Sequence, residues 1–255
     1  MMENFRIQEV TLENIDACGI YCIKNSNSLG AQAKKEWYLN RKEEGLKIRL
    51  AMDANGKQLG MIESVPAEYA WRPIQAANYL FIQCLIEFTK SIQNKGIGTS
   101  LIEACEEEAI STEKSGIFTL VSSRSWMAGK GIFEKNGYQF VENKGRFELW
   151  SKTFNNINKL PKILNYELNQ KNYQGWNLLY SDQCPWHAKA AVEIQKKALE
   201  KGVKLNIQRI ETAAEAQNGP SGFGTFSLIK DGKLLEDHYI SATRFENILR
   251  KELGN

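Results

Sequence analysis

Hydrophobic and polar positions along the N-terminal half of the chain predict strands separated by helices. Leu46, Ile48 and Leu50 alternate with polar residues and precede the turn-forming run Asp53-Ala54-Asn55-Gly56. Alternation that ends at such a turn is typical of a hairpin, so residues 46–52 and 58–65 are expected to pair. Further strands are predicted at residues 5–10, 79–88, 117–121, 138–142 and 146–151.

Helical spacing is clearest in the segment that begins at Thr99. Its apolar residues are expected to form one buried stripe, with glutamates largely on the other faces. Further helices are predicted at residues 32–42 and 129–135, and through residues 15–22 behind a cap at Thr11 or Asn14. The residues expected in the buried stripe are Leu101, Ile102, Cys105, Ala109 and Ile110.

The junction between the strand at 79–88 and this helix reads Gln93-Asn94-Lys95-Gly96-Ile97-Gly98-Thr99-Ser100. Gly96 and Gly98 lack a Cβ, so the backbone can approach a ligand closely there. The N–H groups of residues 96–100 would lie at the start of a helix, where unpaired donors and the helix dipole favour an anion. The junction therefore predicts a phosphate site; the alternative is a tight turn that binds nothing.

Two common phosphate loops do not fit this segment. A P-loop has four residues between its glycines, followed by Lys and Ser or Thr, whereas one residue separates Gly96 from Gly98. The dinucleotide fingerprint requires a third small residue at the position of Leu101. These mismatches argue against Walker chemistry and against nicotinamide binding.

The pattern Gln-x-x-Gly-x-Gly between a strand and a helix resembles the acyl-CoA diphosphate loop of the GNAT superfamily of N-acyltransferases. The order of elements over residues 4–153 also resembles that family. The resemblance implies an α/β (α+β) fold with a mixed sheet, acetyl-CoA as co-substrate, and no metal. It also implies a gap in the sheet, where the pantetheine arm pairs with strand backbone. CoA contacts are accordingly expected at Leu85, Ile86, Glu87, Gln93, Asn94, Lys95, Gly96, Ile97, Gly98, Thr99 and Ser100, and at Lys130 and Phe133.

The catalytic groups depart from the family pattern. In many members a tyrosine four residues before a Gly-aromatic pair stands near the CoA sulfur, and Phe133 occupies that place before Gly137-Tyr138. A phenyl ring cannot donate a proton, so another group protonates the thiolate or the thiolate leaves into water. Glu63 and Cys84 are the catalytic candidates, with Glu63 the carboxylate suited to general-base work. The alternative is that each is an ordinary strand residue, and Cys84 a small packed hydrophobe.

After residue 155 the chain begins a second series of elements. Residues 155–172 are predicted to form a linker between a domain at 1–154 and another at 173–255. The second has the element order strand, helix, strand, short helical segment, hairpin and helix, which resembles a thioredoxin-like domain. Cys184-Pro185 stands where that family keeps its reactive cysteine. However, His187 replaces the second cysteine and Gly224 replaces the usual cis-proline, so a dithiol activity is not expected.

The combination of these domains resembles the YoaP-type acetyltransferases. The segments Glu68-Tyr69-Ala70-Trp71-Arg72-Pro73 and Ser125-Trp126-Met127-Ala128-Gly129-Lys130 also fit that group. This resemblance covers almost the whole chain but does not identify the amine that would accept the acetyl group.

The composition of the chain limits the classes of partner and the cellular location that are expected. The 255 residues carry a net charge of +3, with both signs interspersed, so nucleic acid is not expected as a partner. No secretory signal or apolar membrane span is recognisable, which makes a cytoplasmic protein without membrane contact the expectation. The five cysteines are an odd number at irregular spacing and are expected to be reduced.

Three hypotheses remain at this point. The first is an N-acyltransferase that moves an acetyl group from acetyl-CoA to a small-molecule or peptide amine. The second is an acyl-CoA-binding protein without transferase activity, whose C-terminal domain recognises a protein partner. The third is a monothiol enzyme centred on Cys184, which lies at a predicted helix start with His187 one turn away.

Overall fold

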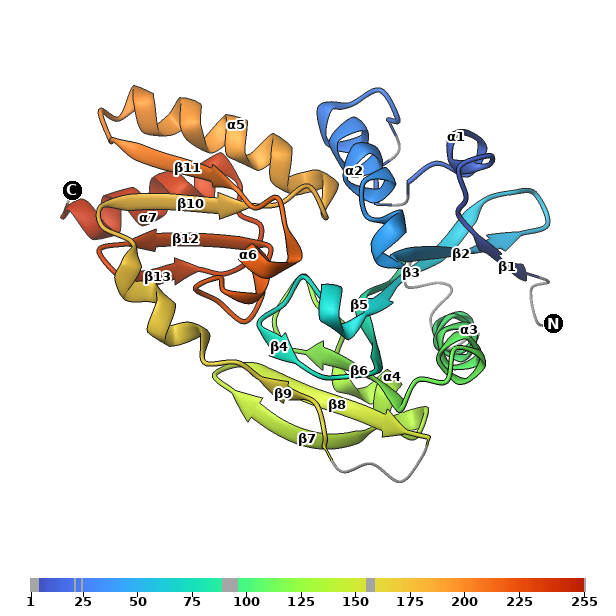
Figure 1. Cartoon of the computed structure of the whole chain (residues 1–255). Coiled ribbons are helices and arrows are strands. Elements are labelled where there is room, and N and C mark those ends of the chain that lie inside the picture. The colour runs from blue at the N-terminus through green and yellow to red at the C-terminus, as the bar shows by residue number, and fades with distance from the viewer. Residues whose placement is uncertain (1–4, 21, 24, 89–95, 155–158, 255) are drawn as a thin grey trace. The chain divides into compact units, whose positions relative to one another are not determined.

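The computed structural model describes residues 5–20, 22–23, 25–88, 96–154 and 159–254, and it divides into two compact units (Figure 1). The first unit contains residues 1–24, 39–70 and 74–163. The second contains residues 25–38, 71–73 and 164–255. The predicted domain limits of 1–154, 155–172 and 173–255 remain a proposal, and they differ from the two units by leaving residues 25–38 and 71–73 with the N-terminal part.

The first unit is built on a mixed seven-stranded sheet with the order β1-β2-β3-β5-β6-β8-β7. Neighbouring strands are antiparallel except for β5 and β6, which are parallel. The predicted α/β class with a mixed sheet is confirmed. The strands are β1 (Phe5–Glu9), β2 (Lys47–Asp53), β3 (Gln58–Pro66), β5 (Tyr79–Glu87), β6 (Gly116–Val121), β7 (Gln139–Lys144) and β8 (Phe147–Thr153).

Two short strands were not predicted. They are β4 (Ile74–Gln75) and β9 (Lys162–Ile163), which pair with each other in an antiparallel ribbon. The 3₁₀ helix η4 (Tyr166–Asn172) follows β9. The segment predicted as a linker therefore contains regular elements, and residues 155–158 of it lie outside the described part of the chain.

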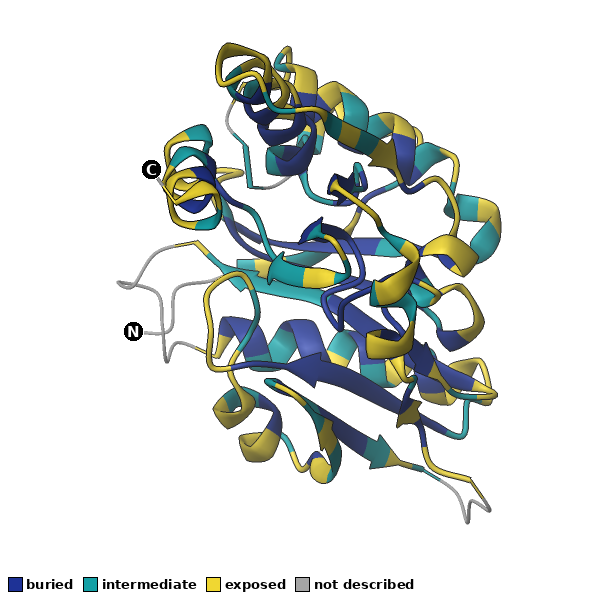
Figure 2. Cartoon of the chain, turned by 90° about the vertical axis from the view of Figure 1, so that its left-hand side faces the viewer, coloured by how far each residue is buried: buried dark blue, intermediate teal, exposed yellow. Residues whose placement is uncertain are grey.

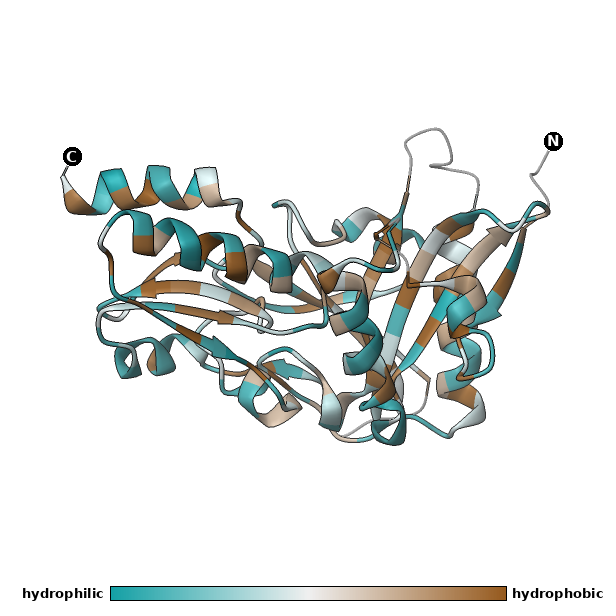
Figure 3. Cartoon of the chain, turned by 90° about the horizontal axis from the view of Figure 1, so that it is seen from above, coloured by the Kyte–Doolittle hydropathy of each residue, from teal (hydrophilic) through white to brown (hydrophobic). Residues whose placement is uncertain are grey.

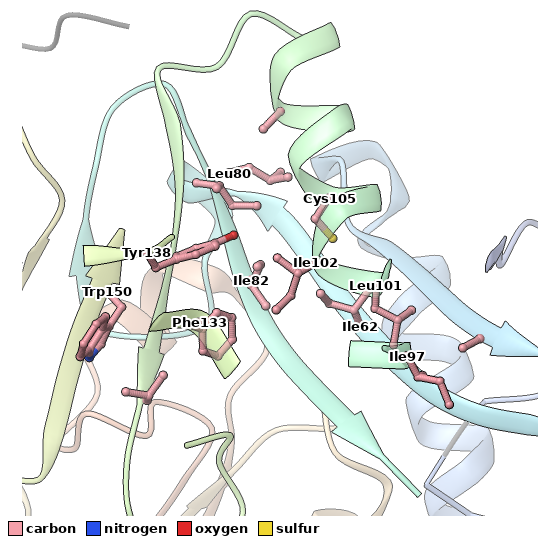
Figure 4. Close-up of a cluster of buried hydrophobic side chains, with 14 of the residues drawn as sticks. Ile62, Leu80, Ile82, Ile97, Leu101, Ile102, Cys105, Phe133, Tyr138 and Trp150 are labelled. Atoms are coloured by element: carbon pink, nitrogen blue, oxygen red, sulfur yellow. The ribbon is translucent and has the colours of Figure 1, made fainter. Parts of the chain in front are cut away.

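The helices α3 (Ile97–Ser111) and α4 (Lys130–Lys135) contribute to one hydrophobic cluster with the sheet. Ile97, Leu101, Ile102 and Cys105 project from α3 towards the strands, as Figure 4 shows. Ile110 was predicted to join this stripe but is 59% exposed. At about 100° per residue it lies half a turn away from Leu101, so the stripe ends at Ala109.

The remaining helices of the N-terminal half are short or shifted. α1 (Ile15–Cys18) ends well before the predicted residue 22, at Gly19, which has a φ of 71°. Asn14 accepts a hydrogen bond from the Thr11 N–H at 2.7 Å, so its side chain closes a turn and does not cap the helix. α2 spans Leu29–Leu39 where residues 32–42 were predicted, and the irregular stretch after β3 contains the 3₁₀ helix η2 (Ala67–Tyr69).

The second unit has a four-stranded sheet with the order β11-β10-β12-β13. β10 is parallel to β11 and antiparallel to β12, and β12 and β13 form a hairpin. α7 is amphipathic, as its alternating colours in Figure 3 show, and it buries Phe245, Ile248 and Leu249. The elements are β10 (Trp176–Tyr180), α5 (Pro185–Glu200), β11 (Leu205–Arg209), α6 (Ala213–Gln217), β12 (Phe226–Lys230), β13 (Lys233–Glu236) and α7 (Ala242–Leu253), in the predicted order.

Two segments from the N-terminal half of the chain, residues 25–38 and 71–73, belong to the second unit. The buried Lys34 of α2 donates from Nζ to the Gln183 carbonyl at 2.6 Å. Arg72 stacks on the Phe223 ring at 4.3 Å and donates to the Thr225 hydroxyl at 3.3 Å. In both units buried residues are concentrated in the strands, and exposed ones on the outer turns of the helices (Figure 2).

Candidate functional site

The parallel strands β5 and β6 part halfway along β5. Their register begins at Tyr79 opposite Gly116 and ends at Ile82 opposite Thr119. β6 continues beside β8, whereas β5 continues beside β3 until Glu87 lies opposite Gly60. One edge of β5 beyond Ile82 therefore no longer faces β6 in the described part of the chain.

A β-bulge marks the place where the strands part. Glu63 of β3 lies opposite Cys84, and the next residue, Ser64, lies opposite Ile82. Gln83 is therefore the extra residue on β5. A bulge bends its strand and increases the local twist, which accounts for β5 turning away from β6 at this point.

The backbone of β5 after the bulge presents alternate residues to its open edge. The Phe88 N–H donates to the Leu59 carbonyl at 3.1 Å, so Phe88 and Ile86 direct their backbone groups towards β3. Alternation along an antiparallel pair then directs the N–H and C=O of Leu85 and Glu87 to the other side. Of the three residues predicted to pair with pantetheine, Leu85 and Glu87 have the required orientation and Ile86 does not.

The helix α3 begins beside this edge. Gly96 is its N-cap, with φ 86° and ψ −2°, a left-handed conformation that glycine adopts without strain. The Ser100 N–H donates to the Gly96 carbonyl at 2.9 Å, so that predicted ligand donor is used by the helix itself. Gln93, Asn94 and Lys95, also predicted to contact CoA, lie outside the described residues.

Gly98 is enclosed by two side chains. Its N–H donates to the Glu87 carboxylate at 2.9 Å. A Cβ at Gly98 would overlap Ile132 Cδ1 and would lie 2.7 Å from Glu87 Oε1. A larger residue at this position would therefore require the Ile132 and Glu87 side chains to move.

Two residues of α4 and its end contribute to the site without having been predicted. Besides the contact of Ile132 with Gly98, Asn136 Nδ2 donates to the Thr99 hydroxyl at 3.3 Å. Asn136 also donates to the Ile132 carbonyl at 2.7 Å, which fixes it at the end of α4. Nothing in the spacing of the sequence links these residues to Gly98 and Thr99, because the pairing depends on how α4 packs against α3.

The two residues of α4 that were predicted to contact CoA have the following surroundings. Phe133 is fully buried in the hydrophobic cluster, with its ring centroid 5.3 Å from that of Tyr138 (Figure 4). The Lys130 ammonium is 3.9 Å from a Glu148 carboxylate oxygen and 5.8 Å from the Trp150 ring centroid. Phe133 is thus a core residue in this structure, and the Lys130 side chain contacts two residues of β8.

Glu63 and Cys84 face each other across β3 and β5. Ile62 points into the cluster beneath α3, so the adjacent Glu63 points to the opposite face of the sheet, and Cys84 shares that face. Glu63 is fully buried and Cys84 is partly exposed. The two catalytic candidates are therefore neighbours on the face away from α3.

A polar network on the α3 side of the sheet was not predicted. Arg49 of β2 pairs with Glu108 of α3 at 2.7 Å and donates to the Ser64 hydroxyl at 3.3 Å. Cys105 lies beside it, and burial raises the pKa of its thiol to about 11. Cys105 is thus protonated at neutral pH and is not a nucleophile.

In the second unit, Cys184 is the N-cap of α5, and its carbonyl accepts a hydrogen bond from the His187 N–H at 3.0 Å. The His187 ring is buried, with Nδ1 3.2 Å from the Ser181 carbonyl. Burial lowers the pKa of His187 to about 3. The ring is neutral at physiological pH and supplies no positive charge to activate the Cys184 thiol.

Gly224, at the position expected for a proline, has a φ of 74°. A Cβ there would overlap the Trp71 carbonyl and lie 2.9 Å from Arg72 Cα. The described residues contain no cis peptide bond. Residues 71 and 72 therefore pack directly against Gly224.

None of the helices in the described ranges has both the length and the apolar character required to span a bilayer. In the same ranges, no group of three or more His, Cys, Asp or Glu side chains is arranged to hold a metal ion.

The chain is similar to known proteins over different parts of its length. A family model described as YoaP-like matches residues 204–247. The protein described as the uncharacterized N-acetyltransferase YoaP of Bacillus subtilis (strain 168) is 26% identical over 250 residues, which cover 94% of this chain and 97% of that protein.

Solved structures are similar to part of the chain. An acetyltransferase of the GNAT family from Staphylococcus aureus Mu50 is 13% identical, with a TM-score of 0.42, covering 59% of this chain and 99% of its own. The PaiA N-acetyltransferase of Thermoplasma acidophilum, solved in complex with coenzyme A, is 15% identical, with a TM-score of 0.41 and coverages of 59% and 99%.

Proposed function

We propose that this protein is an acyl-CoA-dependent N-acyltransferase that moves an acetyl group from acetyl-CoA to an amine. The observation that carries the proposal is the opening between β5 and β6 next to the glycine-rich start of α3. The similarity to the Bacillus subtilis N-acetyltransferase, which extends over nearly the whole chain, supports the same activity.

The backbone groups at the opening suit the chemistry of an acyl-CoA. Leu85 and Glu87 direct backbone N–H and C=O groups to the open edge of β5, where the amide-rich pantetheine arm would act as a substitute strand. The first turn of α3 offers backbone donors and the positive end of a helix dipole to the diphosphate. Acetyl-CoA supplies the activated acyl group, and the chain holds it in line with the acceptor.

Glu63 and Cys84 are the proposed catalytic residues, on the face of the sheet away from α3. Glu63 is the carboxylate that could take a proton from the attacking amine, directly or through water. Phe133 cannot protonate the leaving thiolate, so we propose that another group does so or that the thiolate leaves into solvent. The acceptor is a small-molecule or peptide amine.

We propose a thioredoxin-like arrangement for the second unit. The strand order β11-β10-β12-β13, with α5 following β10, supports this arrangement. The neutral, buried His187 argues against an activated thiol at Cys184. A contact with a protein partner through this unit and a location in the cytoplasm also remain proposals.

Calorimetry of the purified protein with acetyl-CoA, CoA and NADH tests the ligand class. Binding of both CoA compounds and no heat with NADH is the expected result, and no heat with either CoA compound would reject the proposal.

Release of free CoA is then followed across a library of amines. Acetylation of any member supports a transferase, whereas binding without release across the whole library favours the acyl-CoA-binding protein.

A further inference from the structure

The side chain of Glu87 occupies the place that the proposed function assigns to a diphosphate. Glu87 is the last residue of β5, and Gly98 lies in the first turn of α3. The Gly98 N–H donates to Glu87 Oε1 at 2.9 Å. An internal carboxylate is thus already bound at the helix start that would receive the ligand anion.

The carboxylate and a diphosphate would compete for the same interactions. Both gain from the Gly98 N–H and from the positive end of the α3 dipole, and each repels the other because both are negatively charged. Ile132 Cδ1 lies close to Gly98 on the α4 side, where it would overlap a Cβ at this position. Glu87 is only partly buried, which allows its side chain to turn outward while the strand β5 stays beside β3.

We propose that Glu87 is a built-in competitor that sets the affinity of the site for acyl-CoA. The inference rests on the proposed function. On ligand binding the Gly98 N–H exchanges the carboxylate for a phosphate oxygen, and the Glu87 side chain moves into solvent. No covalent step is involved. The Glu87 backbone still faces the open edge of β5, so one residue contributes to binding through its main chain and opposes it through its side chain.

The first test is the affinity of Glu87→Gln for CoA, measured by calorimetry at a fixed, low salt concentration. Glutamine keeps the shape and an acceptor oxygen but removes the charge. We expect CoA to bind about three- to tenfold more tightly, the size of a charge effect at a helix N-terminus. Raising the salt concentration should reduce this gain. Glu87→Ala, which also removes the acceptor, should bind CoA at least as tightly as Glu87→Gln.

The matched control is Glu107→Gln, which changes an exposed glutamate of α3, the helix whose first turn Glu87 contacts. It makes the same change in net charge and should bind CoA like the wild type. Thermal unfolding of the ligand-free proteins provides a second readout. Glu87→Gln should unfold at a slightly lower temperature because α3 loses a favourable charge, although it binds CoA more tightly. If Glu87 only stabilised the structure of the site, its substitution would lower both the unfolding temperature and the affinity for CoA.

The outcomes separate the two proposals. Tighter CoA binding by Glu87→Gln, with Glu107→Gln unchanged, supports the competitor role. Unchanged or weaker binding by Glu87→Gln and Glu87→Ala, when the wild type binds CoA, overturns that role and leaves the proposed function standing. If neither the wild type nor any variant binds CoA, the proposed function fails and the inference fails with it.

Discussion

Arg49 of β2 and Glu108 of α3 form an ion pair with an Nη2–Oε2 distance of 2.7 Å, and each side chain is only 9% exposed. Lys47 adds a second contact to Glu108 at 3.1 Å, and Glu9 lies 3.4 Å from Arg49. The pair links the C-terminal part of α3 to the sheet, whereas the ligand loop precedes the first turn of this helix. It is therefore expected to matter for stability more than for binding.

Removing one partner of this pair should strongly destabilise the protein. Glu108→Ala leaves the buried Arg49 guanidinium without its main counter-charge, and the loss of such a partner typically costs about 3–5 kcal/mol. Urea unfolding followed by circular dichroism measures the change. Glu107→Ala, on an exposed position of the same helix, should change the free energy of unfolding by less than about 0.5 kcal/mol. Equal effects of the two substitutions would contradict the role of the ion pair.

Gly98→Asp should abolish most of the CoA binding. A Cβ at this position overlaps Ile132 Cδ1 and crowds the Glu87 carboxylate, and the new carboxylate adds a negative charge where the diphosphate is expected. We expect the affinity for CoA to fall at least about tenfold, because charge repulsion and lost space each cost on the order of 1 kcal/mol. Calorimetry with CoA measures the loss.

The matched control for this substitution is Gly131→Ala in α4. A Cβ at Gly131 meets no atom within 4 Å, and alanine favours a helix. Gly131→Ala should keep the wild-type affinity for CoA. If Gly98→Asp also keeps it, the start of α3 does not bind the diphosphate.

Phe133→Tyr should lower the stability of the first unit without raising turnover. Phe133 is fully buried against Tyr138, so an added hydroxyl must be buried within an apolar cluster. Leaving a hydroxyl there without a partner costs about 1–3 kcal/mol. Thermal unfolding measures the cost, and CoA release with an accepted amine measures turnover. A gain in turnover would instead show that the phenol reaches the CoA sulfur and supplies the missing acid.

The order of elements could be predicted from the sequence because each long element carries a local pattern. The β2–β3 hairpin has alternating apolar residues around Asp53-Ala54-Asn55-Gly56, and the Gly56 N–H donates to the Asp53 carbonyl at 3.1 Å as a turn requires. The stripe of α3 likewise follows from helical spacing. The strands β4 and β9 could not be predicted, because each is two residues long and forms only by pairing with a distant segment.

The candidate site was predictable only where one segment determines it. Gly96 and Gly98 are recognisable because their lack of a Cβ has a direct geometric consequence. The contact of Ile132 with Gly98, and the bulge at Gln83, depend on tertiary packing and strand register. Phe133 was assigned to the ligand by resemblance, but its apolar ring packs into the cluster beneath α3. The assignment of residues 25–38 and 71–73 to the second unit likewise depends on long-range contacts.

Gly224→Ala tests how residues 71–73 pack within the second unit. Alanine at a φ of 74° is strained, and its Cβ would overlap the Trp71 carbonyl. Gly202→Ala is the matched control, because Gly202 has a similar φ of 66° and a Cβ there would meet nothing within 4 Å. We expect Gly202→Ala to cost about 1 kcal/mol from backbone strain, and Gly224→Ala to cost about 1–3 kcal/mol more because the segment must move. Chemical unfolding measures both, and equal costs would contradict close packing at Gly224.

His187 should make the stability of the protein depend on pH below neutrality. Its pKa is near 6.5 in an unfolded chain, and burial lowers it to about 3 in the folded protein. Between these values the unfolded chain binds a proton that the native ring does not. The stabilising effect of the neutral ring is therefore complete above pH 6.5 and is lost progressively as the pH falls towards 3, by at most about 1.4 kcal/mol per pH unit.

This dependence is measured by comparing free energies of unfolding at pH 7 and pH 5. His187→Phe removes the titrating group from the space beside Phe223 and Phe226 and should make the difference between the two pH values smaller by about 2 kcal/mol. If His187→Phe shows the same loss of stability at pH 5 as the wild type, the His187 ring is charged in the folded protein, and the argument that it cannot activate Cys184 no longer holds.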